Sequence, residues 1–381
     1  MAGHVRKLEN GRWIARFPVG GRGRFRSRTF DRKRDAQSWL TTQTSRRDRG
    51  EWIDPTLAGE SFRSVAEAWE RSRRNVAPST AARDGSYLKT LILPALGDYE
   101  LRHITVDVLN DWVGDLDQEK APATVRKAFQ LAAAILDSAV AAGKVATNPA
   151  RIRKAIELPP LPHEEMRFLS ADEVYRLADR IEPRYRALVL TAAFTGLRWG
   201  ELVGLKAKHL NLETGRLSVV ETLSEVGGYT SFKAPKTAAS KRTVTLPAGL
   251  VDVLRQHLSD WPAVGNGLVF TWQSGTPILR SNFRQRMWEP ALEAAGLAPL
   301  RFHDLRHSHA ALLIGQGEHV KVIQSRLGHS SISVTMDTYG HLLEGLDSGT
   351  ATRLDAAMKH YGSTDPKRTP ASVGAGSGKK A

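Results

Sequence analysis

The sequence contains no cysteine, which excludes disulfide bonds, thiolate nucleophiles and cysteine–zinc sites. No apolar run is long enough to cross a bilayer, and the first residues, MAGHVRKLENGRW, lack the apolar segment of a secretory signal. No glycine-rich nucleotide-binding loop is present either. We therefore expect a cytoplasmic protein that has no membrane partner.

Acidic residues are also scarce relative to basic ones. The chain of 381 residues holds 55 Lys and Arg against 40 Asp and Glu, which gives a net charge of +15 and a pI near 10. Such an excess favours a polyanionic partner, with nucleic acid as the leading candidate. The charge alone would fit a ribosome-associated or membrane-surface protein equally well. A length of 381 residues leaves room for two or three domains, and a hydrophobic content of 41% supports globular cores.

The basic excess is concentrated at the N-terminus, where residues 1–55 hold 14 Lys and Arg against 6 Asp and Glu. The alternation in GRWIARFPVGGRGRFRSRTF predicts two strands joined by a turn, and a short helix follows. One face of the first strand is apolar: Trp13, Ala15 and Phe17. Arg24, Arg26 and Arg28 share one face of the second strand. We predict that this arginine row contacts DNA; a solvated basic hairpin is the alternative.

Residues 61–150 show helical periodicity throughout. SVAE at Ser64–Glu67 has the form of a capping box that opens the first helix. PATVRKAFQLAAAILDSAVAAG predicts a long helix with Gly143 near its C-terminal end. We interpret this stretch as a compact helical module that grips DNA. The proline-rich IELPPLPHEEM at 156–166 then predicts a linker.

The second half of the chain changes its periodicity twice. LSADEVYRLADRI predicts a helix that Ser170 and Glu173 cap, and the next helix ends at Gly196. Residues 210–246 alternate as strands do, and helices return from about 248 to 360. The last residues, GSTDPKRTPASVGAGSGKKA, have the composition of a disordered segment.

Two stretches in this half carry basic residues at turns. FTGLRWGELVGL places Arg198 directly after the glycine that ends an apolar helix, where it either binds a ligand or pairs with Glu201. FKAPKTAASKRTVTLP predicts a strand, a turn and a second strand. Four basic side chains crowd this turn: Lys233, Lys236, Lys241 and Arg242. A lysine there can donate a proton to a bound ligand, although such clusters are more often solvated loops.

Two further stretches carry histidine. In RFHDLRHSHA, His303 and Arg306 share a helical face. His303 and His307 give the outline of the zinc-protease pattern H-E-x-x-H, with Asp304 in place of the glutamate and no third ligand evident, so we expect no metal. LGHSSISVTMDTYGH holds His329 and Tyr339. Taken alone, Tyr339 is either a tyrosine at the edge of a core or a nucleophile.

These four stretches together supply what phosphodiester cleavage without a metal requires. Such cleavage requires positive charge on the non-bridging oxygens, an acid for the leaving oxygen and a nucleophile. Two arginine forks can clamp a phosphate, a lysine can protonate the leaving 5′-oxygen, and histidines can hydrogen-bond the phosphate or handle the tyrosine proton. A tyrosine nucleophile would leave a phosphotyrosine ester, which keeps the bond energy for rejoining.

The order Arg198, Lys236, HDLRH, LGHSS and TMDTYGH, over residues 165–361, resembles the catalytic domain of the tyrosine recombinase, or phage-type integrase, family. The resemblance implies Arg198 and Arg306 as the phosphate clamp, Lys236 as general acid and Tyr339 as nucleophile. It also implies His303 as the histidine of an H-x-x-R pair and His329 as a second site histidine. His307, His309 and His341 lie outside this set, and Glu201 is expected to be structural. The resemblance implies no cofactor.

We therefore predict a multidomain α+β protein. Its segments would be an arm-type DNA-binding domain of sheet and helix at 1–58, an all-helical core-binding domain at 59–152 and a linker at 153–166. A mostly helical catalytic domain with a small antiparallel sheet would follow at 167–361, and a disordered basic tail at 362–381. The expected function is site-specific DNA recombination, which integrates and excises a phage genome or mobile element in a bacterial host.

The expected partners are double-stranded attachment sites, with a tetramer assembled on two of them. A host DNA-bending protein and an excision factor are further candidate partners. Three rival functions remain at this point: a type IB topoisomerase-like activity, a zinc hydrolase centred on HDLRH, and a DNA-binding regulator that would be indifferent to Tyr339→Phe.

Overall fold

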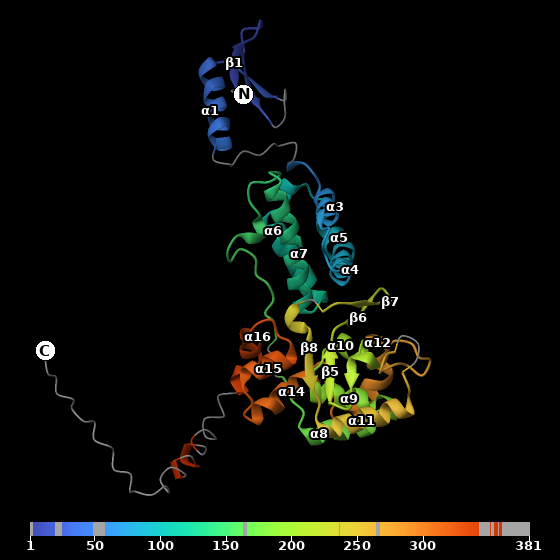
Figure 1. The fold of residues 1–381 in the computed structure, drawn as a ribbon. Coiled ribbons are helices and arrows are strands. Elements are labelled where there is room, and N and C mark those ends of the chain that lie inside the picture. The colour runs from blue at the N-terminus through green and yellow to red at the C-terminus, as the bar shows by residue number, and fades with distance from the viewer. Residues whose placement is uncertain are drawn as a thin grey trace, which may run out of the picture. The chain divides into compact units, whose positions relative to one another are not determined.

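The computed structural model describes residues 3–19, 25–48, 58–162, 166–235, 237–263 and 267–342, together with 351, 354–356 and 358–359. The chain divides into two compact units, residues 1–164 and 165–381. Helices dominate, and the strands form small antiparallel sheets, as the α+β prediction stated (Figure 1). The finer division into five segments stays a prediction. In the described part of the chain, no helix has the length and apolar character needed to cross a membrane.

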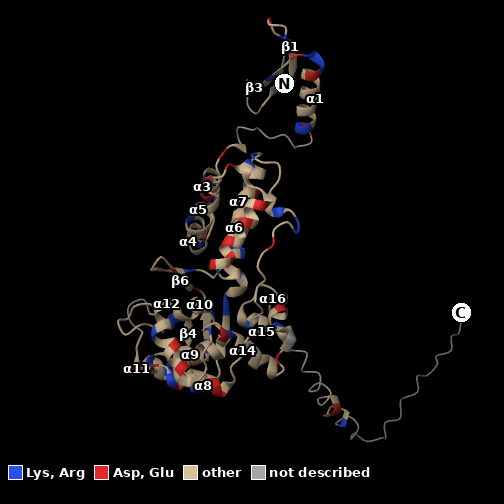
Figure 2. Ribbon diagram, turned by 180° about the vertical axis from the view of Figure 1, so that it is seen from behind, with Lys and Arg blue, Asp and Glu red and all other residues tan. Residues whose placement is uncertain are grey.

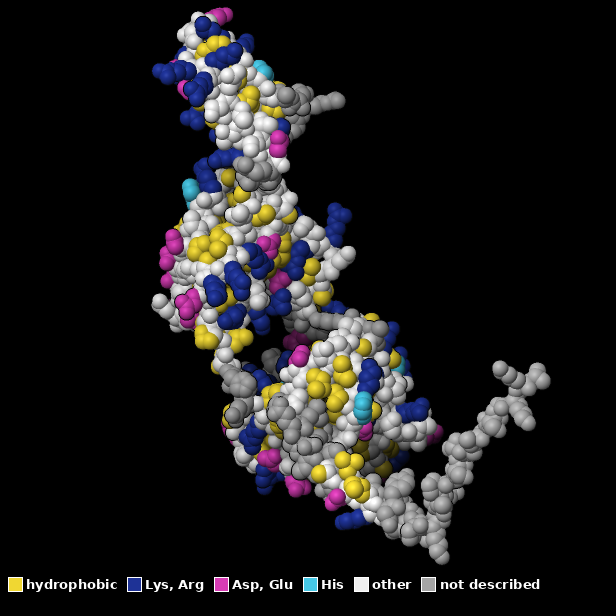
Figure 3. Space-filling model, turned by 90° about the vertical axis from the view of Figure 1, so that its left-hand side faces the viewer, with side chains coloured by type: hydrophobic (Ala, Val, Ile, Leu, Met, Phe, Trp, Pro, Cys, Tyr) yellow, Lys and Arg dark blue, Asp and Glu magenta, His cyan; other side chains and the backbone are white. Residues whose placement is uncertain are grey.

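The first unit begins with the predicted small sheet. Its strands β1 (His4–Lys7), β2 (Trp13–Pro18) and β3 (Phe25–Phe30) lie in the order β1–β2–β3, and α1 (Lys33–Asp48) follows. The side chains of Ala15 and Phe17 are completely buried, as is that of Ala36 on α1, so helix and sheet share an apolar interior. Lys and Arg gather at both ends of α1 (Figure 2). The surface of this part also carries many basic side chains (Figure 3).

The rest of the first unit is helical, as predicted. Its helices are α3 (Phe62–Ser72), α4 (Pro78–Tyr87), α5 (Leu93–Leu96), α6 (Val106–Glu119) and α7 (Pro122–Ala141). They bury one apolar cluster, in which Ile92, Leu109 and Ile135 are fully enclosed. Gly143 lies just beyond α7 at a φ of +67°, where the lack of a side chain permits the left-handed backbone that ends the helix.

The predicted start of α3 is wrong by three residues. Ser61 rather than Ser64 is the N-cap, because its side chain accepts a hydrogen bond from the backbone N–H of Ser64 at 3.3 Å. The earlier start has a packing reason. Phe62 is completely buried, and together with Val65 and Ala66 it forms an apolar face that a helix beginning after Ser64 would leave incomplete.

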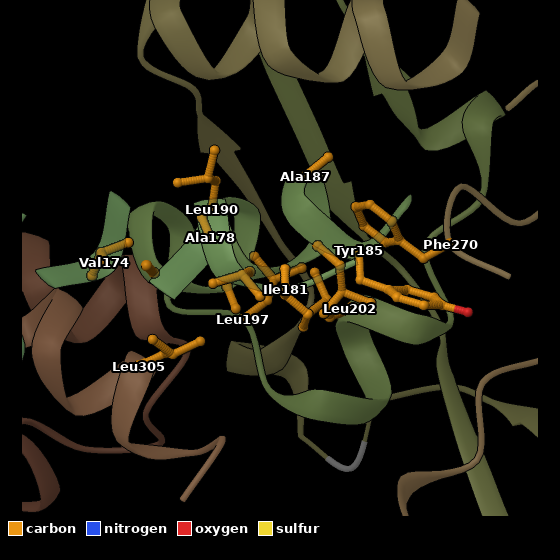
Figure 4. Packing of buried hydrophobic residues seen from close by; sticks show 14 of the residues in the cluster. Val174, Ala178, Ile181, Tyr185, Ala187, Leu190, Leu197, Leu202, Phe270 and Leu305 are labelled. Atoms are coloured by element: carbon orange, nitrogen blue, oxygen red, sulfur yellow. The ribbon is translucent and has the colours of Figure 1, made fainter. Parts of the chain in front are cut away.

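The second unit is built around α9 (Pro183–Thr195), which is buried along most of its length. Before it lies α8 (Ala171–Arg180), and the predicted capping box at its start is confirmed, since Ser170 and Glu173 bond each other's backbone N–H. The other helices are α10 (Trp199–Val203), α11 (Ala248–Asp260), α12 (Arg280–Phe283), α13 (Glu289–Ala295), α14 (Asp304–Gly315), α15 (Val320–Leu327) and α16 (Ile332–Tyr339). Leu197 and Leu305 both belong to the main apolar cluster (Figure 4).

The strands of the second unit form two sheets. In one the order is β4 (Leu210–Asn211), β5 (Arg216–Val219) and β8 (Arg242–Thr245); the other pairs β6 (Thr222–Val226) with β7 (Tyr229–Lys233). The strands predicted on either side of the lysine-rich turn are present as β7 and β8, but they do not pair with each other as a hairpin. The strands β7 and β8 belong to different sheets, because Val244 of β8 pairs with Leu217 of β5 in the apolar interior. The actual hairpin is β6–β7, which turns at Gly227 and Gly228, both at positive φ.

A second, smaller apolar cluster lies at the C-terminal end of this unit. It comprises Ala310, Ile314, Ile323, Leu327 and Tyr339, contributed by α14, α15 and α16. The predicted nucleophile is thus a core residue as well, with 2% of its side chain exposed.

Candidate active site

Both predicted clamp arginines follow a leucine of the main core, which fixes the backbone from which each side chain extends. Leu197 is 2% exposed and Leu305 is completely buried. Helix α9 ends at Gly196, whose φ of +66° redirects the chain so that Arg198 becomes the N-cap of α10. Arg306 lies in the first turn of α14. The sequence therefore places two guanidinium groups on rigid supports.

The backbone carbonyls of two other segments hold these guanidinium groups. Arg306 donates to Gly196 O at 2.5 Å and to Leu327 O at 2.7 Å, and its side chain is buried. Arg198 donates to Gly328 O at 3.2 Å. The acceptors Leu327 and Gly328 directly precede His329, so these bonds gather the arginines, the end of α9 and the predicted histidine in one place. Burial, reinforced by the charge of Arg198, lowers the pKa of Arg306 to about 9, and the group stays charged at neutral pH.

Glu201 orients two arginines from inside the protein. Its carboxylate accepts from Arg198 Nη1 at 2.9 Å, from the backbone N–H of Arg198 at 3.0 Å and from Arg242 Nη2 at 2.8 Å. The Arg198–Glu201 pair, considered as an alternative to ligand binding, therefore exists alongside the contact to Gly328. Burial alone would raise the pKa of Glu201, but hydrogen bonds and charge from Arg242 and Arg198 outweigh it and keep the pKa below its ordinary value.

Arg242 connects the sheet to the segment that carries the histidine and tyrosine. Besides binding Glu201, its Nε donates to Arg326 O at 2.6 Å. Arg326 in turn donates to His309 Nε2 at 3.0 Å and to Phe194 O at 3.1 Å. Burial, with the charge of Arg326 next in importance, lowers the pKa of His309 to about 3, so this histidine is a neutral structural acceptor.

Tyr339 points back to α14, the helix that carries Arg306. Its Oη lies 2.8 Å from Nδ1 of His307, and the ring centroids are 5.7 Å apart. Burial raises the pKa of Tyr339 to about 12, against the opposing charge of Arg306. The two predicted site histidines lie nearby: the His303 ring is 5.0 Å from that of His307, and His329 Nδ1 is 2.8 Å from Thr335 Oγ1.

These two histidines are neutral at physiological pH. Desolvation lowers the pKa of His303 to about 4, with help from His307 and Arg306, although the residue as a whole is exposed to solvent. Burial lowers the pKa of His329 to about 4, and the charges of Arg306 and Arg198 add to the effect. A neutral imidazole can donate one hydrogen bond and accept another, which suits contact with a phosphate oxygen.

The remaining predicted residues are placed as follows. Lys236 and Arg24 lie outside the described residues. Arg26 and Arg28 are exposed on β3, directly opposite Phe17 and Ala15 of β2. Because side chains of directly paired residues share a sheet face, Arg26 and Arg28 lie on the face that α1 covers, beside buried residues. The other face carries Arg6 and Arg16, which pair with Ile14 and His4 in the neighbouring strand.

The residues that resemble the zinc-protease pattern, Asp304 and His307, make other contacts in the structure. The carboxylate of Asp304 accepts from the backbone and guanidinium N–H groups of Arg301, at 2.8 to 3.3 Å. His307 Nδ1 is engaged by Tyr339. Within the described ranges, no group of three His, Asp or Glu side chains is arranged to hold a metal ion. HDLRH thus contributes an arginine and two histidines to a site rich in positive charge.

Comparison with known proteins identifies the family. The profile of the Phage integrase family matches residues 167–345, that of the phage integrase central domain matches 62–155, and that of the phage integrase N-terminal domain matches 1–49. The chain belongs to the phage integrase family. As a member of this family of strand-exchange enzymes, it is a DNA strand transferase of the tyrosine recombinase type.

Relatives and solved structures agree with this membership. The putative prophage phiRv2 integrase of Mycobacterium tuberculosis is 29% identical over 359 residues, which cover 92% of this chain and 94% of that one. The Tn1549 transposon integrase in complex with transposon right-end DNA has a TM-score of 0.67 at 18% identity, over 78% of this chain and 100% of that one. A lambda integrase tetramer bound to a Holliday junction has a TM-score of 0.54 at 18% identity, over 86% and 95%. These two structural similarities concern the fold.

Two residues of the site in this phage integrase family member, Arg242 and His307, are not among the site residues predicted from the sequence. The sequence places Arg242 among the basic side chains that crowd a turn, without singling it out, yet its side chain is 6% exposed. A usable signal existed, because strand alternation places Arg242 on the same face as the buried Val244. His307 was left outside the set. Its bond to Tyr339 joins residues 32 apart in the sequence and had no local signal.

Proposed function

We propose that the chain is the integrase of a phage or integrative element, and that Tyr339 is its nucleophile. In each cleavage, Oη attacks a DNA phosphorus and the bond from phosphorus to the 5′-oxygen breaks. A 3′-phosphotyrosine ester and a free 5′-hydroxyl result. Attack by the 5′-hydroxyl of another strand reverses these bonds, so strands are exchanged at nearly constant bond energy.

The observation that carries this proposal is the convergence of three distant segments on one small region. Arg306 binds the carbonyls of Gly196 and Leu327, Arg198 binds the carbonyl of Gly328, and Tyr339 bonds the residue next to Arg306. A phosphate received there would meet two guanidinium groups whose positions folding has already set. Preorganised donors of this kind stabilise the charge that develops on a pentacovalent phosphorus.

The remaining roles follow from residue chemistry. We assign Lys236 as the acid that protonates the leaving 5′-oxygen, since an ammonium group can give up a proton near neutral pH when it is held among other cations. His303 and His329 would hydrogen-bond the non-bridging oxygens as neutral imidazoles. Arg198 and Arg306 would form the clamp. Every step uses side chains of this chain and no cofactor.

The assembly follows from the same chemistry. Exchange between two duplexes requires four cleavages, so four protomers on two attachment sites would act in pairs through a Holliday junction. The similarity to a lambda integrase tetramer on such a junction supports this arrangement. Arm DNA would be bound by the N-terminal sheet, with Arg24, Arg26 and Arg28 among its contacts. A host DNA-bending protein and an excision factor would complete the set of partners.

The test is covalent trapping. Full-length protein is incubated in EDTA with DNA from the junctions that flank the gene, nicked so that the cleaved strand diffuses away. We expect a protein–DNA band that survives denaturation in the wild type and vanishes with Tyr339→Phe. Tyr185→Phe is the matched control: Tyr185 is equally buried, on α9, and its loss should leave the band intact. Binding to this DNA without a band in the wild type would favour a DNA-binding regulator.

A further inference from the structure

The phenol oxygen of Tyr339 is held by a histidine that the family resemblance does not assign. His307 Nδ1 lies 2.8 Å from Oη, and among the described residues it is the one hydrogen-bond partner of that oxygen. His307 follows Arg306 on α14, so the helix that supports the phosphate clamp also presents this imidazole to the nucleophile. The hydrogen bond therefore joins α14, which carries Arg306, to α16, which carries Tyr339.

The proton on Oη has to leave before the oxygen can form a bond to phosphorus. Tyr339 is 2% exposed, and burial raises its pKa to about 12, so neither bulk water nor spontaneous ionisation removes the proton at neutral pH. Burial also lowers the pKa of His307 below its ordinary value, although Asp304 opposes the shift. His307 is therefore unprotonated at neutral pH and has a lone pair to offer.

We propose that His307 is the general base of strand cleavage. The inference rests on Tyr339 being the nucleophile, as proposed above. As Oη attacks phosphorus, its proton passes to Nδ1 of His307; the bond from phosphorus to the 5′-oxygen breaks, and that oxygen takes its proton from the general acid. In rejoining, the imidazolium returns the proton to Oη as the tyrosine leaves. Charge and protons balance in both directions.

The other site histidines are placed less well for this task. His329 Nδ1 is bonded to Thr335, and the imidazole lies close enough to Arg306 and Arg198 for their charges to lower its pKa. His303 stands behind His307, with the two rings perpendicular and their centroids 5.0 Å apart. Proximity to the reacting oxygen therefore distinguishes His307 from both, and a general base must first satisfy that geometric requirement.

The surroundings of His307 give the transferred proton a route to water, and they tune the proton affinity of the imidazole. His307 and His303 both line a cavity of about 1050 Å³, through which water can reach the imidazole. The titratable and charged groups that face His307 are Asp304 and Arg306 from its own helix, Arg301 and His303 from the residues just before that helix, Tyr339 from α16 and His329 from the segment between α15 and α16. The two arginines oppose protonation and Asp304 favours it, which keeps the proton transfer reversible.

His307→Asn separates base catalysis from positioning, because the asparagine amide places an oxygen where Nδ1 stands and still accepts a hydrogen bond but takes no proton at neutral pH. We expect the cleavage rate on the nicked substrate to fall by roughly 10²-fold or more, the usual contribution of a general base. His307→Leu, which removes the bond entirely, should fall at least as far. Rejoining of the trapped intermediate by an added 5′-hydroxyl strand should slow to the same degree.

Two further measurements distinguish the chemistry from a folding defect. Wild-type cleavage should decline as the pH falls through the His307 pKa, which lies below 6.5, and this decline should be absent from His307→Asn. Replacing Tyr339 by a fluorotyrosine, whose phenol ionises more readily, should restore much of the cleavage that His307→Asn loses. Each variant is first shown to bind the site DNA as the wild type does.

The outcomes are distinct. Cleavage by His307→Asn at the wild-type rate would overturn the proposal and leave His307 a positioning residue. Faster cleavage by both variants would also overturn it, and would show that the bond holds Tyr339 back. Absence of cleavage in the wild type would instead defeat the assignment of Tyr339 and Proposed function with it.

Discussion

Replacing Glu201 with glutamine tests whether one buried carboxylate organises the site. The side chains of Glu201 and Arg242 are 5% and 6% exposed, so the variant leaves a buried guanidinium without a counter-charge. Breaking a buried pair from one side costs about 3–5 kcal/mol. The glutamine oxygen can still accept one of the bonds, so we expect the free energy of unfolding of this unit to fall by the lower figure, about 3 kcal/mol.

The direction of the Glu201 pKa shift determines how this loss of stability should change with pH. The pKa of Glu201 in the folded chain lies below its ordinary value of 4.5. The ionised carboxylate therefore stabilises the fold above about pH 4.5, and this contribution is lost as the pH falls through the lower, folded-state value. The difference between wild type and Glu201→Gln should accordingly be largest at pH 7 and shrink in acid. The variant should also lose cleavage activity, because Arg198 keeps at most one of its two contacts to the side chain at position 201.

The measurement is urea unfolding read by hydrogen exchange of peptides from α9 and α10, which reports this unit separately from residues 1–164. Asp252→Asn is the control, because the Asp252–Arg255 pair is 74% and 59% exposed and its loss should cost about 0.5 kcal/mol or less. A loss below about 1 kcal/mol for Glu201→Gln at pH 7, or one that does not shrink in acid, would refute the reasoning.

Two further predictions concern the backbone and the N-terminal sheet. Gly196→Ala should destabilise the second unit by roughly 2–3 kcal/mol, since φ is +66° and a Cβ would lie 2.7 Å from Leu327 and 2.8 Å from His309; Gly296→Ala, at φ +68° with open space around it, should cost only about 1 kcal/mol in thermal unfolding. Arg26→Ala with Arg28→Ala should reduce the slope of log affinity against log salt for arm DNA by roughly 2. The control variant Arg26→Lys with Arg28→Lys keeps both charges and should keep the slope. An unchanged slope in the double alanine variant would exclude phosphate contacts by both arginines.

Local chemistry made part of this structure predictable. The cap formed by Ser170 and Glu173 and the turn at Gly196 depend on residues within a few positions of one another, and both were predicted correctly. The start of α3 was missed because two serines offered competing caps and the burial of Phe62 decided between them. Local preference names candidates, and tertiary packing selects among them.

Features that depend on pairing between distant segments were not accessible in this way. Alternation shows that Arg26 and Arg28 share a face of the strand. Only the register puts their side chains on the same face of the sheet as those of Ala15 and Phe17, and a register shift of one residue would move them to the other face. The position of β8 beside β5 is likewise a tertiary fact. The bond between His307 and Tyr339 requires α14 and α16 to lie side by side, and the hydrophobic periodicity of the sequence does not predict that contact.

The crowding of arginines around Glu201 has a consequence for the lifetime of the protein. Within the described part of the chain, Arg198 and Arg242 bind the buried carboxylate of Glu201 and Arg306 lies within reach of their charges; burial, and after it the repulsion from Arg198, lowers the pKa of Arg306. A phosphodiester bound there, as proposed above, would offset that repulsion and stabilise only the folded form, by about 2.7 kcal/mol at a hundredfold excess over the dissociation constant. A copy released from DNA would be correspondingly nearer to unfolding and to digestion by cellular proteases. On the proposed function, occupancy of the DNA site would thereby be coupled to turnover of the enzyme, and copies that have left their DNA would be removed first.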